Sequence, residues 1–154
     1  ELRSQDIPAI GEINQQGLPG TGKVSQQEIV ELLRIAELTI GAFDGEQLVG
    51  FVLCFLPRTE YVSLNYAWFN QRYQDFLYVD RIAVSEDHRN QSIGSLLYQQ
   101  VISYAKYYNY PIAAEVSLNP PNPGSMRFHQ RFNFTEIGVL NHQSKSVTML
   151  MRDR

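Results

Sequence analysis

The sequence YVDRIAV at residues 78–84 is followed directly by SEDH at 85–88 and by RNQSIGSLL at 89–97. The first segment is largely apolar and predicts a buried strand, and the last begins a helix whose apolar residues recur up to Tyr108. No acidic residue occurs in the first helical turn, so the free N–H groups and the positive end of the helix dipole face the turn uncompensated. Arg89 adds a positive charge, and Gly94 lets backbone approach a ligand closely. The stretch therefore predicts a strand–turn–helix anion site suited to a phosphate or pyrophosphate.

The segments on both sides of this stretch predict a mixed α/β domain. Asp6 is expected to cap a first helix, and Ser25 with Glu28 forms a capping box for a second. Asp44-Gly45 is a hairpin signal between two strands, and residues 76–118 predict a strand–helix–strand crossover. The expected helices cover residues 6–14, 25–36, 92–108 and 125–132, and the expected strands cover 39–43, 48–56, 76–84, 112–118, 134–139 and 146–151. Hairpins followed by a crossover imply a mixed sheet with helices on both faces.

The composition excludes several classes of protein. The chain has 154 residues, 44% hydrophobic and 19% charged, which predicts a single globular domain over 1–154 rather than a disordered chain. A net charge of −3 does not favour nucleic acid or anionic membrane as a partner. The single cysteine, Cys54, and three scattered histidines predict no internal disulfide and no metal site. A reducing compartment, the cytoplasm, is therefore expected.

A second motif lies at residues 122–134, NPGSMRFHQRFNF. Together with DRIAV at 80–84 and RNQSIG at 89–94, it resembles the GNAT superfamily of acetyl-CoA-dependent N-acetyltransferases. That family has an acid-x-Ile-Ala-Val strand, an Arg/Gln-x-x-Gly-x-Gly/Ala turn and an Asn-x-x-Ala/Ser-x-x-Phe-Tyr helix that leads to an x-Gly-Phe corner. The resemblance covers nearly the whole chain. It implies a mostly antiparallel mixed sheet with a central parallel strand pair, and a homodimer is the family's habit.

The resemblance also implies where acetyl-CoA binds. The backbone of Ile82, Ala83 and Val84 would pair with the pantetheine arm, and Asn122, Ser125 and His129 would contact it from the other side. The turn that would hold the pyrophosphate consists of Arg89, Asn90, Gln91, Ser92, Ile93, Gly94 and Ser95. Three residues depart from the family pattern: Ser92 and Asn133 replace glycines, and His129 replaces a tyrosine. Ser92 is strained if its position requires a positive φ, whereas asparagine tolerates that backbone well.

The implied reaction is direct attack of a primary amine on the thioester, and it requires a base and an acid. An alkylamine has a pKa of about 10, so under about one molecule in a thousand is the free nucleophile at pH 7. Asp80 on the strand and Glu115 on the facing strand are the two candidate bases, and His129 is the candidate acid for the departing thiolate. Each has a structural alternative: Asp80 can pair with Arg81 or another cation, Glu115 can act on the substrate side, and His129 can pack beside the cofactor.

The connection over residues 58–75 is long and aromatic. Such loops are often functional, although aromatic residues more often cover a core. If it forms a substrate wall, Tyr66, Trp68 and Tyr73 could hold an ammonium group by cation–π contact. Tyr78, on the following strand, is the fourth predicted substrate-binding residue.

Two other functions remain compatible with the sequence. The departures at Ser92 and His129 are compatible with a non-catalytic acyl-CoA-binding regulatory protein of the same fold. Residues 17–23, GLPGTGK, match the spacing of a phosphate-binding loop, but Val24 replaces the magnesium-binding hydroxyl and a helix rather than a strand precedes Gly17. A nucleotide-binding loop at residues 17–23 is therefore a remote alternative. The sequence does not identify the amine acceptor.

Overall fold

The computed structural model describes all residues, 1–154. Its helices and strands follow the expected order with one addition, helix α3. The helices are α1 (Ile7–Gln16), α2 (Gln26–Ile35), α3 (Leu64–Arg72), α4 (Ile93–Tyr108) and α5 (Pro123–Arg131), with 3-10 turns at Ser4–Asp6 and Glu86–His88. The strands are β1 (Leu38–Asp44), β2 (Gln47–Phe55), β3 (Leu77–Val84), β4 (Ile112–Asn119), β5 (Thr135–His142) and β6 (Lys145–Arg152).

The six strands form one mixed sheet in the order β1-β2-β3-β4-β6-β5. Every neighbouring pair is antiparallel except β3 and β4, which are parallel and lie at the centre. This is the architecture that the sequence predicts. β2 is buried along almost its whole length, because the helices cover both of its faces.

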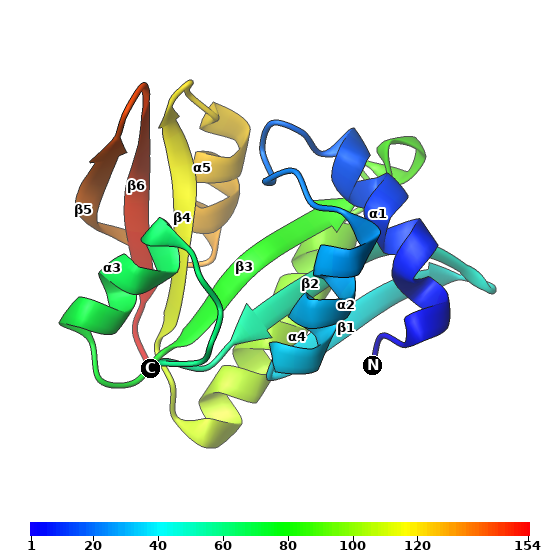
Figure 1. The fold of residues 1–154 in the computed structure, drawn as a ribbon, viewed down its shortest axis with the longest axis horizontal. Coiled ribbons are helices and arrows are strands. Elements are labelled where there is room, and N and C mark those ends of the chain that lie inside the picture. Colours follow the sequence, from blue (N-terminus) through cyan, green and yellow to red (C-terminus); the bar gives the residue numbers. More distant parts are fainter.

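The helices divide between the two faces of the sheet (Figure 1). Helices α1, α2 and α3 pack with one hydrophobic cluster, which includes Ile10, Ile29 and Phe69. Helices α4 and α5 pack with the other, around Leu97, Val101 and their neighbours. No helix combines the length and the apolarity needed to cross a membrane.

Two local expectations are corrected by the structure. Asp6 does not cap α1 with its side chain; its carboxylate accepts a hydrogen bond from the Arg3 N–H at 2.8 Å and closes the preceding 3-10 turn instead. The connection over residues 58–75 is not a plain loop, because Ser63 caps α3 within it. The capping box of α2 is confirmed, with Ser25 and Glu28 bonded reciprocally.

Candidate functional site

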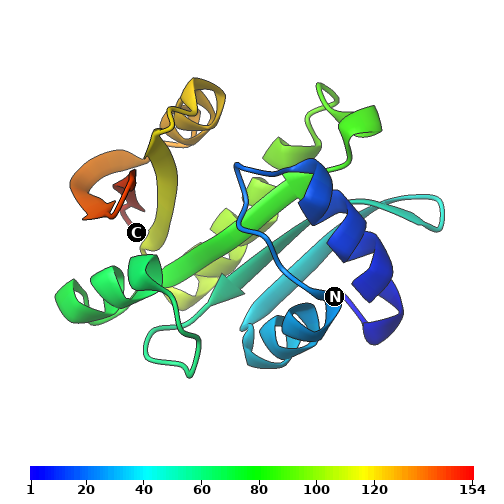
Figure 2. The same cartoon turned by 45° about the horizontal axis from the view of Figure 1, so that its top comes forward.

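The parallel strands β3 and β4 separate soon after they pair. They pair at only two positions, Leu77 with Ile112 and Tyr78 with Ala113, and then diverge (Figure 2). Beyond this point the facing edges of both strands have no partner across the gap, which leaves backbone N–H and C=O groups free for a ligand. A cavity of ≈370 Å³ fills the gap and is lined from both strands, by Ile82, Ala83 and Val84 on one side and Ala114 and Ser117 on the other.

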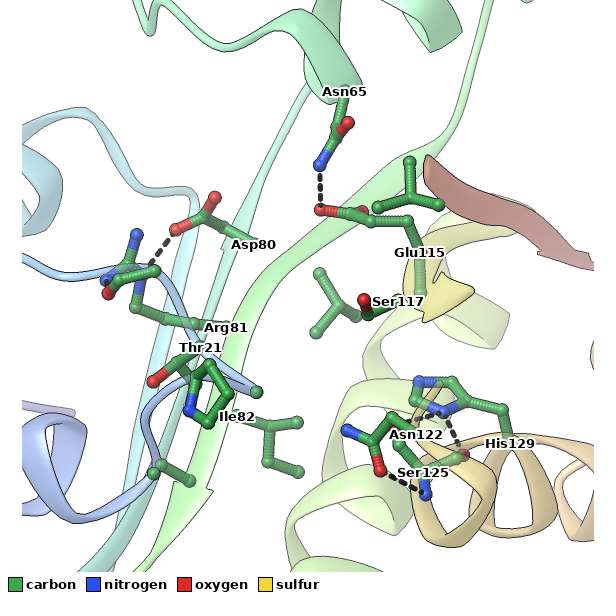
Figure 3. A pocket seen from close by; sticks show the side chains of 18 of the residues that line it. Thr21, Asn65, Asp80, Arg81, Ile82, Glu115, Ser117, Asn122, Ser125 and His129 are labelled. Carbon is green, nitrogen blue, oxygen red and sulfur yellow. Dashed lines mark hydrogen bonds and ion pairs between the residues drawn. The ribbon is translucent and has the colours of Figure 1, made fainter. Parts of the chain in front are cut away.

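Helices and loops from both faces complete the cavity walls. Asn122 and Ser125 line it from the start of α5, where the Asn122 side chain caps the helix by accepting from the Ser125 N–H at 3.2 Å. The α1–α2 loop, residues 17–25, reaches the cavity from the opposite face through Gly20 and Thr21. A Cβ placed on Gly20 would lie 3.5 Å from Asn122 Nδ2, so this loop crosses the gap. Figure 3 shows these residues converging on one space.

The α1–α2 loop does not have the form of a phosphate-binding loop. Helix α1 precedes it, and its polar groups are used within the fold: Asn14 and Arg81 both donate to the Gly22 carbonyl, at 2.9 and 3.1 Å. The nucleotide-binding alternative therefore has no structural basis at residues 17–23.

The turn before α4 has the conformation that an anion site requires. Asn90 and Ser92 have φ values of +64° and +63°, and α4 begins at Ile93 with no acidic residue in its first turn and no side-chain cap. The first N–H groups of α4 are therefore free for a ligand. Arg89 lines the cavity and donates to the Gln16 carbonyl at 3.0 Å. The other predicted cofactor residues (Asn90, Gln91, Ser92, Ile93, Gly94 and Ser95) form the turn and first helical turn beside Arg89 rather than the cavity wall.

We expect Ser92→Gly to stabilise the protein by about 1 kcal/mol, because glycine removes the left-handed strain of a side chain at this position. The melting temperature should rise by about 2–4 °C. Asn90→Gly is the matched control, and its gain should be smaller because asparagine tolerates the same φ. A Ser92→Gly variant that melts below the wild type would show that the Ser92 side chain makes a stabilising contact.

Asp80 is held as a structural ion pair. Its two carboxylate oxygens accept from the Tyr61 hydroxyl at 2.6 Å and from Arg81 Nε at 2.7 Å, and both charged side chains are nearly buried. Arg81 also donates to Asn14 Oδ1, so the pair ties β3 to α1 and to the loop after it. Of the two roles considered for Asp80, the structure contains the ion pair with Arg81.

Glu115, in contrast, presents an unpaired oxygen. Its Oε1 accepts from the Tyr78 hydroxyl at 2.7 Å and from Asn65 Nδ2 at 3.0 Å, whereas Oε2 is shielded from solvent and has no partner. Burial raises the pKa of Glu115 to about 8, against the lowering effect of its two hydrogen-bond donors. Asn65 Oδ1 is buried and unpartnered as well. Both residues line the cavity, and Figure 3 shows the Asn65 amide nitrogen directed at the Glu115 carboxylate.

His129 is buried and bonded at both ring nitrogens. Nδ1 lies 2.8 Å from the Ser125 carbonyl oxygen, and Nε2 lies 2.6 Å from the Tyr98 hydroxyl. A carbonyl oxygen can only accept, so the proton is on Nδ1, and Nε2 accepts from Tyr98. Burial lowers the pKa of His129 and favours the neutral ring.

The four aromatic residues predicted to bind substrate do not line the cavity. Tyr66 is a core residue whose hydroxyl bonds to Thr59 and to the Leu56 carbonyl. Trp68 packs closely on Gly138 and already has the Arg72 guanidinium 4.2 Å from its ring centroid. Tyr73 packs at the edge of the same core, and Tyr78 is fully buried beside Glu115.

Sequence reasoning missed Asn65 and Tyr98. No local pattern marks Asn65, because it meets Glu115 only through the fold. Tyr98 had a signal: it follows Gly94 by four residues and therefore lies on the same face of α4 as the anion turn.

Comparison with known proteins identifies the family of this chain. A family model described as "Acetyltransferase (GNAT) family" matches residues 11–134. No curated protein gives a significant match. The fold is similar to that of Ard1 from Thermoplasma volcanium, with a TM-score of 0.79 and 20% identity over 99% of this chain and 93% of that one.

Two further solved structures are similar at comparable levels. The ribosomal-protein-S18-alanine N-acetyltransferase from Escherichia coli has a TM-score of 0.74 and 15% identity over 98% of this chain and 89% of that one. Naa50 from Arabidopsis thaliana, in complex with the bisubstrate analogue CoA-Ac-MVNAL, has a TM-score of 0.75 and 18% identity over 99% and 95%. These likenesses agree on the fold, and the family model matches most of the chain. The chain therefore belongs to the GNAT family of acetyltransferases.

Proposed function

We propose that this acetyl-CoA-dependent N-acetyltransferase uses Glu115 as its base and takes an α-amino group as its acceptor. The observation that carries the proposal is the unpaired Oε2 of Glu115, a residue that lines the cavity between β3 and β4. A protonated primary amine brings three N–H donors, one of which can bond Glu115 Oε2. The ammonium proton then passes to Glu115 Oε2, which leaves a free amine beside the thioester.

The pKa of Glu115 supports an α-amine over an alkylamine. An α-ammonium group has a pKa of about 8 and an alkylammonium group about 10.4. Proton transfer to a carboxylate whose pKa is about 8 is nearly balanced for the first and uphill by about two pKa units for the second. The bisubstrate analogue of the Naa50 structure likewise joins CoA to a peptide.

The acetyl donor fits the remaining part of the cavity. The free strand edges at Ile82–Val84 offer backbone hydrogen bonds to an amide-containing arm, and Arg89 with the start of α4 offers positive charge to phosphates. Acetyl-CoA, when bound, supplies the acyl group. The chain's own residues position the donor and remove the proton from the acceptor amine.

An acetylation assay on an amine panel tests the proposal. With acetyl-CoA, we expect short peptides with free α-amines to be acetylated faster than peptides blocked at the N-terminus that carry one lysine, and faster than polyamines. A preference for lysine or polyamine would overturn the acceptor assignment. CoA binding without acetylation of any amine would favour the regulatory binding protein instead.

The pH dependence of turnover gives a second test. Glu115 must be ionised to accept a proton, so the low-pH limb of kcat/KM should have its midpoint at about pH 8, and kcat/KM should fall again at higher pH as the free peptide loses the ammonium form that binds. The Tyr78 hydroxyl stabilises the carboxylate, so Tyr78→Phe should raise the pKa of Glu115 and move the midpoint upward by about one pH unit. Because both enzymes are assayed on the same peptide, titration of the amine cancels from the comparison. A midpoint that stays in place or moves to lower pH would contradict Glu115 as the titrating base.

The compartment and the oligomeric state are also proposals. The proposed compartment is the cytoplasm, and the proposed assembly is a homodimer.

A further inference from the structure

Tyr98 is the one α4 side chain that lines the cavity. α4 packs on the far side of the sheet from α1 and α2, and the gap between β3 and β4 opens the sheet in front of it. Val79 and Ala114, the first residues beyond the last strand pair, line the same cavity as Tyr98. A ligand lying in the gap is therefore within reach of a group supplied from behind the sheet.

The hydrogen bonds around His129 prevent it from acting as a proton donor. Its Nδ1–H is committed to the Ser125 carbonyl, and its Nε2 carries no proton to give. The hydroxyl of Tyr98 is the group of this pair that holds a transferable proton. Tyr98 as a residue is only 1% exposed; its ring contacts Phe128, Phe132 and Phe134, and its hydroxyl is held by His129 Nε2.

We infer that Tyr98, anchored on His129, is the catalytic acid that donates a hydrogen bond and then a proton to the departing sulfur. The inference rests on the proposed acetyl transfer. His129 is then a positioning residue. The sequence predicts His129 as the acid, and we assign that role instead to Tyr98 on α4.

The amine nitrogen forms a bond to the acetyl carbon, and the carbon–sulfur bond breaks with its electron pair on sulfur. The Tyr98 hydroxyl turns from His129 Nε2 to the sulfur and transfers its proton. The nitrogen loses its extra protons through Glu115 to water, and Tyr98 recovers one proton from water when the products leave.

The same geometry makes a prediction about bound CoA that does not depend on turnover. A hydroxyl that donates to sulfur stabilises the thiolate, so it lowers the pKa of the CoA thiol in the complex. We expect the thiol of CoA bound to the wild type to titrate about one pKa unit below that of CoA bound to Tyr98→Phe. His129→Gln keeps an acceptor for Tyr98, and the bound thiol should titrate close to its wild-type value.

The experiment therefore compares Tyr98→Phe with His129→Gln by thiolate absorbance of bound CoA, by kcat and by CoA affinity. Tyr98→Phe should lower kcat by about 10²-fold with little change in CoA affinity, and His129→Gln should lower it by less than tenfold. Tyr104→Phe is the matched control, because this α4 tyrosine bonds Glu37 at the surface. If Tyr98→Phe does not fold, the double variant Tyr98→Phe/His129→Leu removes both polar partners together. Its comparison with His129→Leu then isolates the contribution of the Tyr98 hydroxyl.

The reverse order of kcat losses, or a bound thiol that titrates alike in wild type and Tyr98→Phe, would overturn the role of Tyr98. The thiol titration needs only CoA binding, so a failure of the acetylation assay leaves this test intact. The two proposals can thus fail separately.

Discussion

Glu115→Gln is expected to lower kcat by about 10²- to 10⁴-fold, the range by which a positioned general base accelerates proton transfer. Glutamine keeps the shape of the side chain and an oxygen that can accept from Tyr78, but it cannot take the ammonium proton. CoA affinity should stay near the wild-type value, because the proposed phosphate site is formed by Arg89 and the turn before α4, whereas Glu115 lies on β4. Single-turnover acetylation of a peptide α-amine, with CoA affinity measured in parallel, separates the two effects.

Asp80→Asn is the matched comparison. Asp80 is bonded by Tyr61 and Arg81, so its loss leaves the buried Arg81 charge without its partner and should destabilise the protein by about 3–5 kcal/mol. Its kcat, measured well below the melting temperature, should fall less than that of Glu115→Gln. If Asp80→Asn proves fully stable and nearly inactive while Glu115→Gln turns over normally, Asp80 is the base.

Ionisation of Glu115 has opposite effects on activity and on stability: as the pH rises, it increases turnover and decreases the free energy of unfolding. Its pKa is raised from 4.5 to about 8 in the folded protein, so the unfolded chain releases this proton first as the pH rises. Wild-type stability should therefore decline between about pH 4.5 and about pH 8, by an amount on the order of 5 kcal/mol at about 1.4 kcal/mol per pKa unit. Glu115→Gln does not titrate, so it should melt above the wild type at pH 9 and close to it at pH 4.

The fold was predictable because its signals are local. The apolar runs of β2 and β3, the capping box at Ser25 and the crossover through α4 each predict an element that the structure contains. The left-handed backbone at Ser92 and Asn133 was predictable too, since the resemblance places glycine at both positions.

The division of roles among the polar groups was not predictable, because it depends on contacts between distant segments. Asp80 and Glu115 are both carboxylates on facing strands. Arg81 is the sequence neighbour of Asp80, but the contacts of Tyr61 with Asp80 and of Asn65 with Glu115 join distant segments, and no local pattern predicts them. The aromatic connection was expected to be a possible substrate wall. Instead α3 forms within it, places Tyr66 and Phe69 in the core, and brings Asn65 to the site.

Arg89→Glu should weaken CoA binding by about 10²-fold. Arg89 lines the cavity beside the uncapped start of α4, and the substitution places a negative charge where a diphosphate would lie. At an effective dielectric constant of about 20, two unit charges about 4 Å apart interact by about 4 kcal/mol, and solvent screening at this exposed side chain reduces that value. A loss of about 2–3 kcal/mol in binding free energy remains, which corresponds to the expected change in Kd.

Lys106→Glu is the control, because it makes the same change in net charge at the other end of α4. Its CoA affinity should differ from wild type by less than twofold, so the comparison isolates the local field from the overall charge. Calorimetric titration of both variants with CoA, and with pantetheine, which carries no phosphate, completes the test. The Arg89→Glu defect should be present for CoA and absent for pantetheine, since only CoA carries the diphosphate. Equal weakening of the two ligands would mean that Arg89 acts through the C-terminal end of α1, by its bond to the Gln16 carbonyl, rather than on phosphate.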